Sequence, residues 1–198
     1  MSLFDKIKNQ TTGTVGKAVA NVGNAGAQKG SNKSVPVVFS TMPETLSEFR
    51  SLPQAEMKTP FETAAMLVAA LCVYPLNKDE SIAMINYLKG PTPLSNRELQ
   101  FIADRMSQNN KAGFIGASYF NGATPQNDYT PSQPYTVTVS ENPYSYDNQG
   151  YANLYIKSGG ADSARPVNLR QAKDGKWYLW EQLLLADIRQ PESTNPWA

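Results

Sequence analysis

The chain has 198 residues, 18 basic and 17 acidic side chains, 40% hydrophobic residues and a formal net charge of +1. These values fit a soluble globular domain preceded by a tail, because a chain of this length buries about two-thirds of its unfolded surface in one core. One cysteine and no histidine are present, which excludes an intramolecular disulfide, a multi-cysteine zinc site and every catalytic triad that uses histidine. We therefore expect no metal and no cofactor, and we favour a function other than catalysis.

The first 34 residues differ in charge from the rest of the chain. Five lysines stand there against Asp5, a charge of +4, so the remaining residues sum to −3. Leu3, Phe4 and Ile7 have helical spacing beside lysines, as in a short amphipathic helix that lies on a membrane or a protein. Glycines then recur among alanines, and each costs about 1 kcal/mol in a helix relative to alanine. We expect a flexible basic leader over residues 1–34, with partner association, or weak membrane-surface contact through residues 1–10, as the alternatives.

The N-terminal half of the body predicts a strand followed by helices: a strand over 35–41, a short helix over 43–50, and helices over 59–74, 77–88 and 95–106. Thr59 followed by Pro60 is typical of a helix start, because threonine caps and proline fits the first turn. The nearly continuous apolar run to Tyr74 indicates a buried central helix that is too short to span a bilayer. Ser95 and Glu98 form a capping box. With no secretory signal in the first ten residues, we expect a cytoplasmic protein.

The C-terminal half predicts antiparallel strands, because residues 135–139, 152–156 and 167–171 alternate apolar and polar side chains. Asp174 and Gly175 are typical of a two-residue hairpin turn. That turn would put four side chains on the face that meets the helices: Val167, Leu169, Tyr178 and Trp180. Helices before strands favour an α+β domain over residues 35–198, with three main helices packed on an antiparallel sheet of about four strands.

The loop over residues 158–165 is the candidate ligand site. Its glycines let a ligand approach the backbone, while serine hydroxyls and an Asp162–Arg165 pair supply donors and acceptors for an anion or a sugar. Aromatic residues interleaved with asparagines earlier in the chain resemble a glycan or peptide surface. They are Tyr119, Phe120, Tyr129, Tyr135, Tyr144, Tyr146 and Tyr151. The candidate ligand-binding residues are Ser158, Gly159, Gly160, Asp162, Ser163, Arg165, Tyr129 and Tyr135. In the alternative interpretation the loop only reverses the chain and the tyrosines fill a half-buried sheet.

Several short strings resemble an uncharacterised domain family of clostridial and related Gram-positive bacteria. They are Ser118 to Pro125 (SYFNGATP), Tyr129 to Pro131 (YTP), Pro134-Tyr135, Ser158 to Ser163 (SGGADS), Trp177 to Glu181 (WYLWE), Asp187 to Arg189 (DIR) and Pro196 to Ala198 (PWA). The resemblance covers residues 35–198. It implies no activity and assigns no catalytic or binding residue.

Three functional hypotheses follow. The favoured one is a non-enzymatic cytoplasmic module that binds a protein or a small polar ligand; nucleic acid is excluded because the body is net negative. The second is a histidine-independent hydrolase that acts on a glycan through two carboxylates. Its candidate acids are Asp128, Glu141, Asp147, Asp162 and Glu181. The third is a peripheral membrane protein anchored by its basic N-terminus, and the sequence leaves the oligomeric state open.

Overall fold

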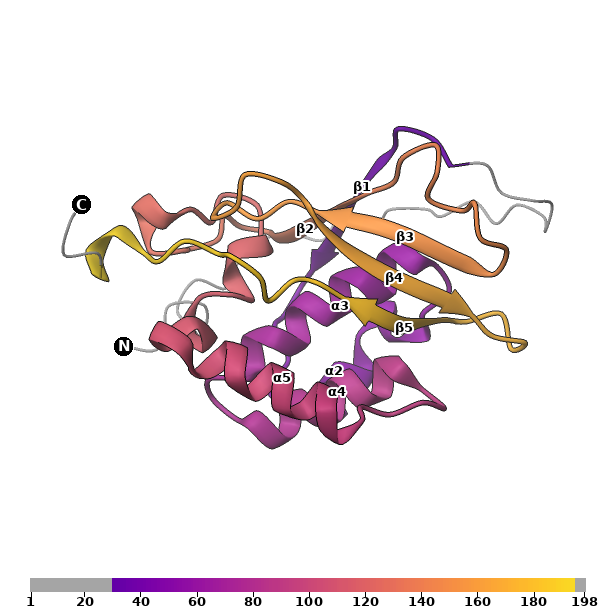
Figure 1. Ribbon diagram of the computed structural model, residues 1–198, viewed down its shortest axis with the longest axis horizontal. Coiled ribbons are helices and arrows are strands. Elements are labelled where there is room, and N and C mark those ends of the chain that lie inside the picture. The colour runs from indigo at the N-terminus through magenta and orange to yellow at the C-terminus, as the bar shows by residue number, and fades with distance from the viewer. Residues whose placement is uncertain (1–29, 195–198) are drawn as a thin grey trace.

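The computed structural model describes residues 30–194, so the predictions for residues 1–29 lie outside the described part. The described residues form an α+β fold in which the helices gather on one face of an antiparallel sheet (Figure 1). The α-helices are α2 (Leu46–Ser51), α3 (Pro60–Val73), α4 (Lys78–Lys89) and α5 (Asn96–Ser107). The strands are β1 (Ser34–Phe39), β2 (Tyr135–Ser140), β3 (Tyr151–Ile156), β4 (Arg165–Gln171) and β5 (Trp177–Gln182).

The five strands follow one another across the sheet in the order β1-β2-β3-β4-β5, and every neighbouring pair is antiparallel. The predicted fold class is confirmed, with one strand more than the number expected. Short 3-10 helices join the elements: η1 (Pro53–Glu56), η2 (Gln108–Gly113), η3 (Ala117–Tyr119), η4 (Pro125–Asn127) and η5 (Glu192–Thr194).

The predicted helix starts are confirmed by their caps. The Thr59 hydroxyl accepts from Glu62 N and the Ser95 hydroxyl from Glu98 N, each within a complete capping box. Such boxes satisfy backbone donors that the first turn leaves unpaired. A third capping box, which the sequence interpretation did not identify, starts α2 at Thr45.

Helix α3 is the centre of the core. It lies against all five strands on one side and against α4 on the other, so apolar residues all round it are buried. Burial raises the pKa of the Cys72 thiol to about 12, which makes this cysteine an unreactive core residue. Within residues 30–194, no helix combines the length and apolar character needed to cross a bilayer.

The β4–β5 hairpin differs from the predicted two-residue turn. Ala172 N donates to Lys176 O at 2.9 Å and Gly175 N donates to Ala172 O at 3.0 Å. The loop therefore contains Lys173, Asp174 and Gly175, with Gly175 in the left-handed region at φ 82°. This is the three-residue hairpin in which a type I turn is followed by a left-handed glycine.

The longer loop moves the register of β5 by one residue. Leu169 pairs with Leu179 and Gln171 pairs with Trp177, and a shift of one residue exchanges the two faces of a strand. Trp177 and Leu179 consequently lie in the core, whereas Trp180 is 41% exposed. The predicted inward position of Trp180 is wrong, while the predicted burial of Val167 and Leu169 on β4 is confirmed.

Candidate functional site

The Gly-rich loop between β3 and β4 packs into the body of the domain. Ser158 is 1% exposed, and its hydroxyl bonds to the Ser118 hydroxyl at 2.9 Å and accepts from Gly160 N at 3.1 Å. A side chain at Gly159 would meet Ala123 O, and one at Gly160 would meet the hydroxyl of Tyr129. These glycines are needed because two other segments approach the loop closely.

One of the segments near this loop is the C-terminal segment, residues 184–194. Arg189 N donates to Gly160 O at 3.0 Å, and the Tyr129 hydroxyl donates to Arg189 O at 2.6 Å. The Tyr119 hydroxyl likewise donates a hydrogen bond to Leu184 O at 2.6 Å. Figure 1 shows this segment, coloured yellow, running back past the region that contains η3 and η4. Two of the groups predicted to bind a ligand, the Gly160 carbonyl and the Tyr129 hydroxyl, thus bind the chain's own C-terminal segment.

The predicted Asp162–Arg165 pair is wrong. Arg165 donates instead to Ala186 O at 3.1 Å, to Asp187 O at 3.3 Å and to the Ser163 hydroxyl at 2.9 Å. The carboxylate of Asp162 pairs with Arg189 and is 89% exposed. Asp162 and Arg165, which were predicted to pair with each other, therefore each bind the C-terminal segment.

The tyrosines predicted to form one surface divide between the core and the surface. Four of the predicted aromatic residues are buried: Tyr119, Phe120, Tyr129 and Tyr135. Tyr129 is stacked on Phe114 with centroids 5.4 Å apart, and burial raises its pKa to about 12 although the charge of Arg189 acts to lower it. Tyr144 is 73% exposed, while Tyr146 and Tyr151 are half-buried.

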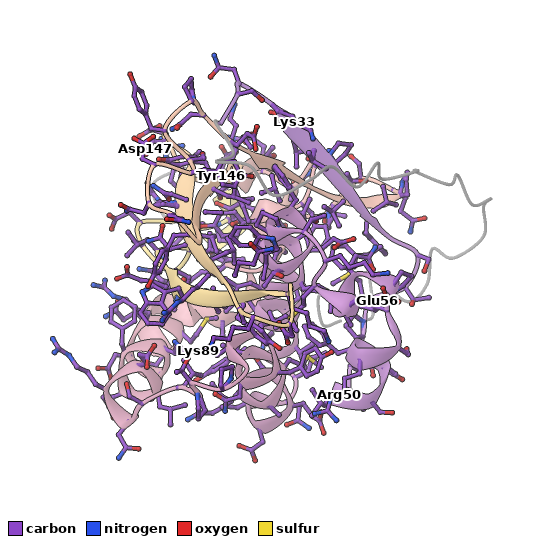
Figure 2. The ribbon with its side chains drawn as sticks, turned by 90° about the vertical axis from the view of Figure 1, so that its right-hand side faces the viewer. Lys33, Arg50, Glu56, Lys89, Tyr146 and Asp147 are labelled. Atoms are coloured by element: carbon purple, nitrogen blue, oxygen red, sulfur yellow. The ribbon has the colours of Figure 1, made fainter. Side chains whose placement is uncertain are left out.

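The five acids of the hydrolase hypothesis are mostly held by local partners. Four of them accept from neighbouring groups: Asp128 from Ser193, Glu141 from Ser31 and Tyr146, Asp162 from Arg189 and Glu181 from Asn168. Asp147 is exposed at the surface beside Tyr146 (Figure 2). Residues 30–194 contain no cluster of three or more acidic or cysteine side chains suited to a metal ion. The hydrolase hypothesis stays a prediction.

The sheet face opposite the helices carries a partly exposed aromatic cluster, formed by Tyr151 of β3, Arg170 of β4 and Trp180 of β5. The Arg170 guanidinium carbon lies 4.9 Å from the Trp180 ring centroid and 5.3 Å from that of Tyr151. The two rings meet edge to face with centroids 5.8 Å apart. The cluster places a cation against two aromatic rings, which also contact each other, on the solvent side of three neighbouring strands.

Polar and apolar groups extend this surface, which we call the outer sheet face. Alternation along β3 and β4 puts Tyr155 and Asn168 on it beside the cluster. Asn168 donates to Glu181 at 3.4 Å. Leu183, 47% exposed, follows β5 and bonds through its N–H to Pro166 O at 3.1 Å. The outer sheet face therefore combines amides, hydroxyls, one free guanidinium and exposed apolar area.

The sequence matches the family described as Domain of unknown function (DUF6935) over residues 41–192. The chain belongs to this family. The matched range includes α2 to α5, β2 to β5 and most of the C-terminal segment, so the DUF6935 domain is nearly the whole described fold. Neither the comparison with curated proteins nor the comparison with solved structures finds a match.

Arg170 and Trp180 of this DUF6935 domain were missed as candidate binding residues. The predicted two-residue turn placed the Trp180 side chain in the core, so the prediction did not include Trp180 among the exposed residues. The sequence did contain a usable signal, because Lys173-Asp174-Gly175 also fits a three-residue hairpin with glycine last. That interpretation would have put Trp180 outside the core.

Proposed function

We propose that this domain is a non-enzymatic, cytoplasmic interaction module that binds a protein partner through the outer sheet face. The observation that carries the proposal is the environment of Arg170. Its guanidinium is flanked by two rings and makes no hydrogen bond or ion pair with any residue between 30 and 194. The side chain is ordered by stacking, and its donors remain free for a partner.

The chemistry of the cluster favours a partner segment that presents a carboxylate next to an apolar group. A guanidinium stacked on rings keeps its in-plane N–H groups available for bidentate bonding to a carboxylate. Trp180 and Leu183 offer apolar area to the neighbouring part of the same segment. Tryptophan, tyrosine and arginine are also the residues that most often dominate binding at protein interfaces. Glu181 lies on the same face and repels a second carboxylate, so a single acidic residue fits better than an acidic run.

Selection from a random peptide library on the full-length protein tests the proposal. We expect enrichment of peptides with one Asp or Glu beside an aromatic or aliphatic residue. Arg170→Gln and Trp180→Ala should each weaken binding of a selected peptide at least tenfold, because truncating such anchors costs about 1.4 kcal/mol or more.

Two matched variants control this experiment. Tyr144→Ala removes a more exposed aromatic side chain away from the cluster, and Lys173→Gln removes a cation from the β4–β5 loop. Both should bind the selected peptide as the wild type does. The proposal fails if the wild type selects no peptide, or if Arg170→Gln binds as tightly as Lys173→Gln.

A further inference from the structure

A groove on another side of the domain lies between α2, α4 and β5. It has a volume of about 520 Å³, which is within the range of about 300 to 1,000 Å³ found for small-molecule sites. Its walls include the rings of Tyr87 and Tyr178 and the backbone of Gly90. Arg50 and Lys176 supply charge from two elements distant in sequence, and Figure 2 labels Arg50 at the end of α2.

The side-chain nitrogen groups left free in this groove are all donors. The two tyrosine hydroxyls are already engaged, Tyr87 with Ala55 O at 2.9 Å and Tyr178 with Asp174 at 2.8 Å. Asn86 uses its amide oxygen to accept from Leu94 N at 2.8 Å, which leaves its NH₂ group as a donor. A ligand that satisfies these groups must bring acceptors.

The cations of the groove are not neutralised by ion pairs inside the fold. The Arg50 guanidinium carbon stacks 5.0 Å from the Tyr87 centroid. Neither Arg50 nor Lys176 has a carboxylate within ion-pair distance among residues 30–194.

Two acids lie near the groove, and both are held by other donors. Glu56 pairs with Lys58. Asp174 accepts from Lys176 N at 3.0 Å and from the Tyr178 hydroxyl. These hydrogen bonds and the charge of Lys176 lower the Asp174 pKa although burial acts to raise it. The local charge that a ligand meets is therefore positive at Arg50 and partly compensated at Lys176.

We propose that this groove binds a small organic anion: a carboxylate or phosphate carried on a flat apolar body. The anion lies between Arg50, Lys176 and the Asn86 amide, because charge-assisted hydrogen bonds to these donors are the strong ones. The flat body lies against Tyr87 and Tyr178, which line the groove; the Tyr178 ring is seated directly on Gly90, where any side chain would displace it. The site is separate from the outer sheet face, and its existence does not depend on the function proposed for that face.

Calorimetric titration of the full-length protein with phenyl phosphate and benzoate tests this site, with phenol and inorganic phosphate as the partial ligands. We expect both aromatic anions to bind at millimolar concentration and to bind at least fivefold more tightly than either partial ligand. Of the two anions, the tighter one identifies the head group that the donors prefer. Binding should weaken as salt rises, because ions screen the charges at this open groove.

Variants separate the groove from unspecific charge effects. Arg50→Gln should weaken binding of the preferred anion at least fivefold. Ala83→Leu fills the groove from α4 without changing charge, and leucine suits a helix, so it should abolish binding while the protein stays folded. Lys173→Gln, on the same hairpin as Lys176, should bind unchanged. Absence of binding by both aromatic anions, equal binding of inorganic phosphate, or full binding by Ala83→Leu would each overturn the proposal.

Discussion

The buried lysine at the end of α4 gives the sharpest stability prediction. Lys89 has a side chain only 8% exposed, and its Nζ lies 2.7 Å from Glu98 Oε1 of α5 and 3.3 Å from Trp180 O of β5. Figure 2 labels it between the helical layer and the sheet. Glu98→Gln removes the carboxylate charge but keeps the capping box, in which glutamine serves at the same position. The substitution therefore isolates the charge interaction that joins three elements.

The stability that Glu98→Gln is expected to lose follows from the pKa of Glu98. Burial acts to raise this pKa, but hydrogen bonds from Lys89 and Ser95 and the charge of Lys89 outweigh it, and the pKa falls from 4.5 to about 2. This difference between the unfolded and the folded pKa corresponds to about 3 kcal/mol of folding free energy before screening by water is considered. Because the Glu98 side chain is 42% exposed, water screens part of this interaction. We expect Glu98→Gln to lower the free energy of unfolding at neutral pH by about 2 kcal/mol, since it leaves a buried ammonium unpaired.

Urea unfolding of the wild type and the variant measures this loss, and the pH dependence gives a second test. A carboxyl whose pKa is lowered on folding contributes stability that is present above the unfolded pKa and is lost as pH falls through the folded pKa. The difference between the two proteins should therefore be full above pH 4.5 and should shrink as pH falls towards about 2.

Two variants decide whether the buried charge is responsible. Glu48→Gln makes the same change in the exposed capping box of α2, which has no ion pair among the described residues, and should cost less than about 0.5 kcal/mol. Lys89→Met added to Glu98→Gln removes the unpaired ammonium and should restore part of the lost stability. The reasoning is refuted if Glu98→Gln costs no more than Glu48→Gln, or if the double variant is less stable than Glu98→Gln alone.

Three further substitutions test the packing. Gly160→Ala brings a methyl group against the Tyr129 hydroxyl. We expect the free energy of unfolding to fall by at least about 2 kcal/mol and proteolysis after residue 183 to become faster. Unchanged digestion would contradict this expectation. A side chain at Gly175 meets no neighbour, but the residue has φ 82°. Thermal unfolding should therefore show that Gly175→Ala lowers the free energy of unfolding by about 1 kcal/mol, and that Gly175→Asn lowers it less. Thr63→Val removes the 2.6 Å bond to Trp177 O; chemical denaturation should show a loss of about 1 to 3 kcal/mol, and a neutral result would mean that this bond does not secure β5.

Local signals in the sequence were enough to predict the helices. The Thr59 and Ser95 caps act over one turn, and the apolar run of α3 requires burial on every side, so neither depends on distant residues. The register of the β4–β5 hairpin was different, because Asp174-Gly175 is compatible with loops of two or of three residues. One residue decided whether Trp177 or Trp180 entered the core.

The loop that was predicted as a site shows the limit of local interpretation. The sequence predicted that a ligand approaches the backbone at Gly159 and Gly160, and in the structure other parts of the chain approach both glycines. The approaching groups are Ala123, Tyr129 and the C-terminal segment, and this contact depends on long-range packing that no spacing in the loop encodes. Asp162 likewise pairs with Arg189 and not with the nearby Arg165, because the fold brings the distant arginine closer.

An energetic difference between the Gly-rich loop and the outer sheet face supports the proposed position of the partner. A ligand at the Gly-rich loop would have to replace the bonds from Tyr129 to Arg189 and from Arg165 to Ala186 and Asp187. Each such bond contributes about 1 kcal/mol net, so breaking them would reduce the binding free energy of this ligand by several kcal/mol. Arg170 is already ordered by its two rings and has no bond to break. The same ligand therefore gains more at the outer sheet face, provided that it carries the acceptor that a stacked guanidinium requires.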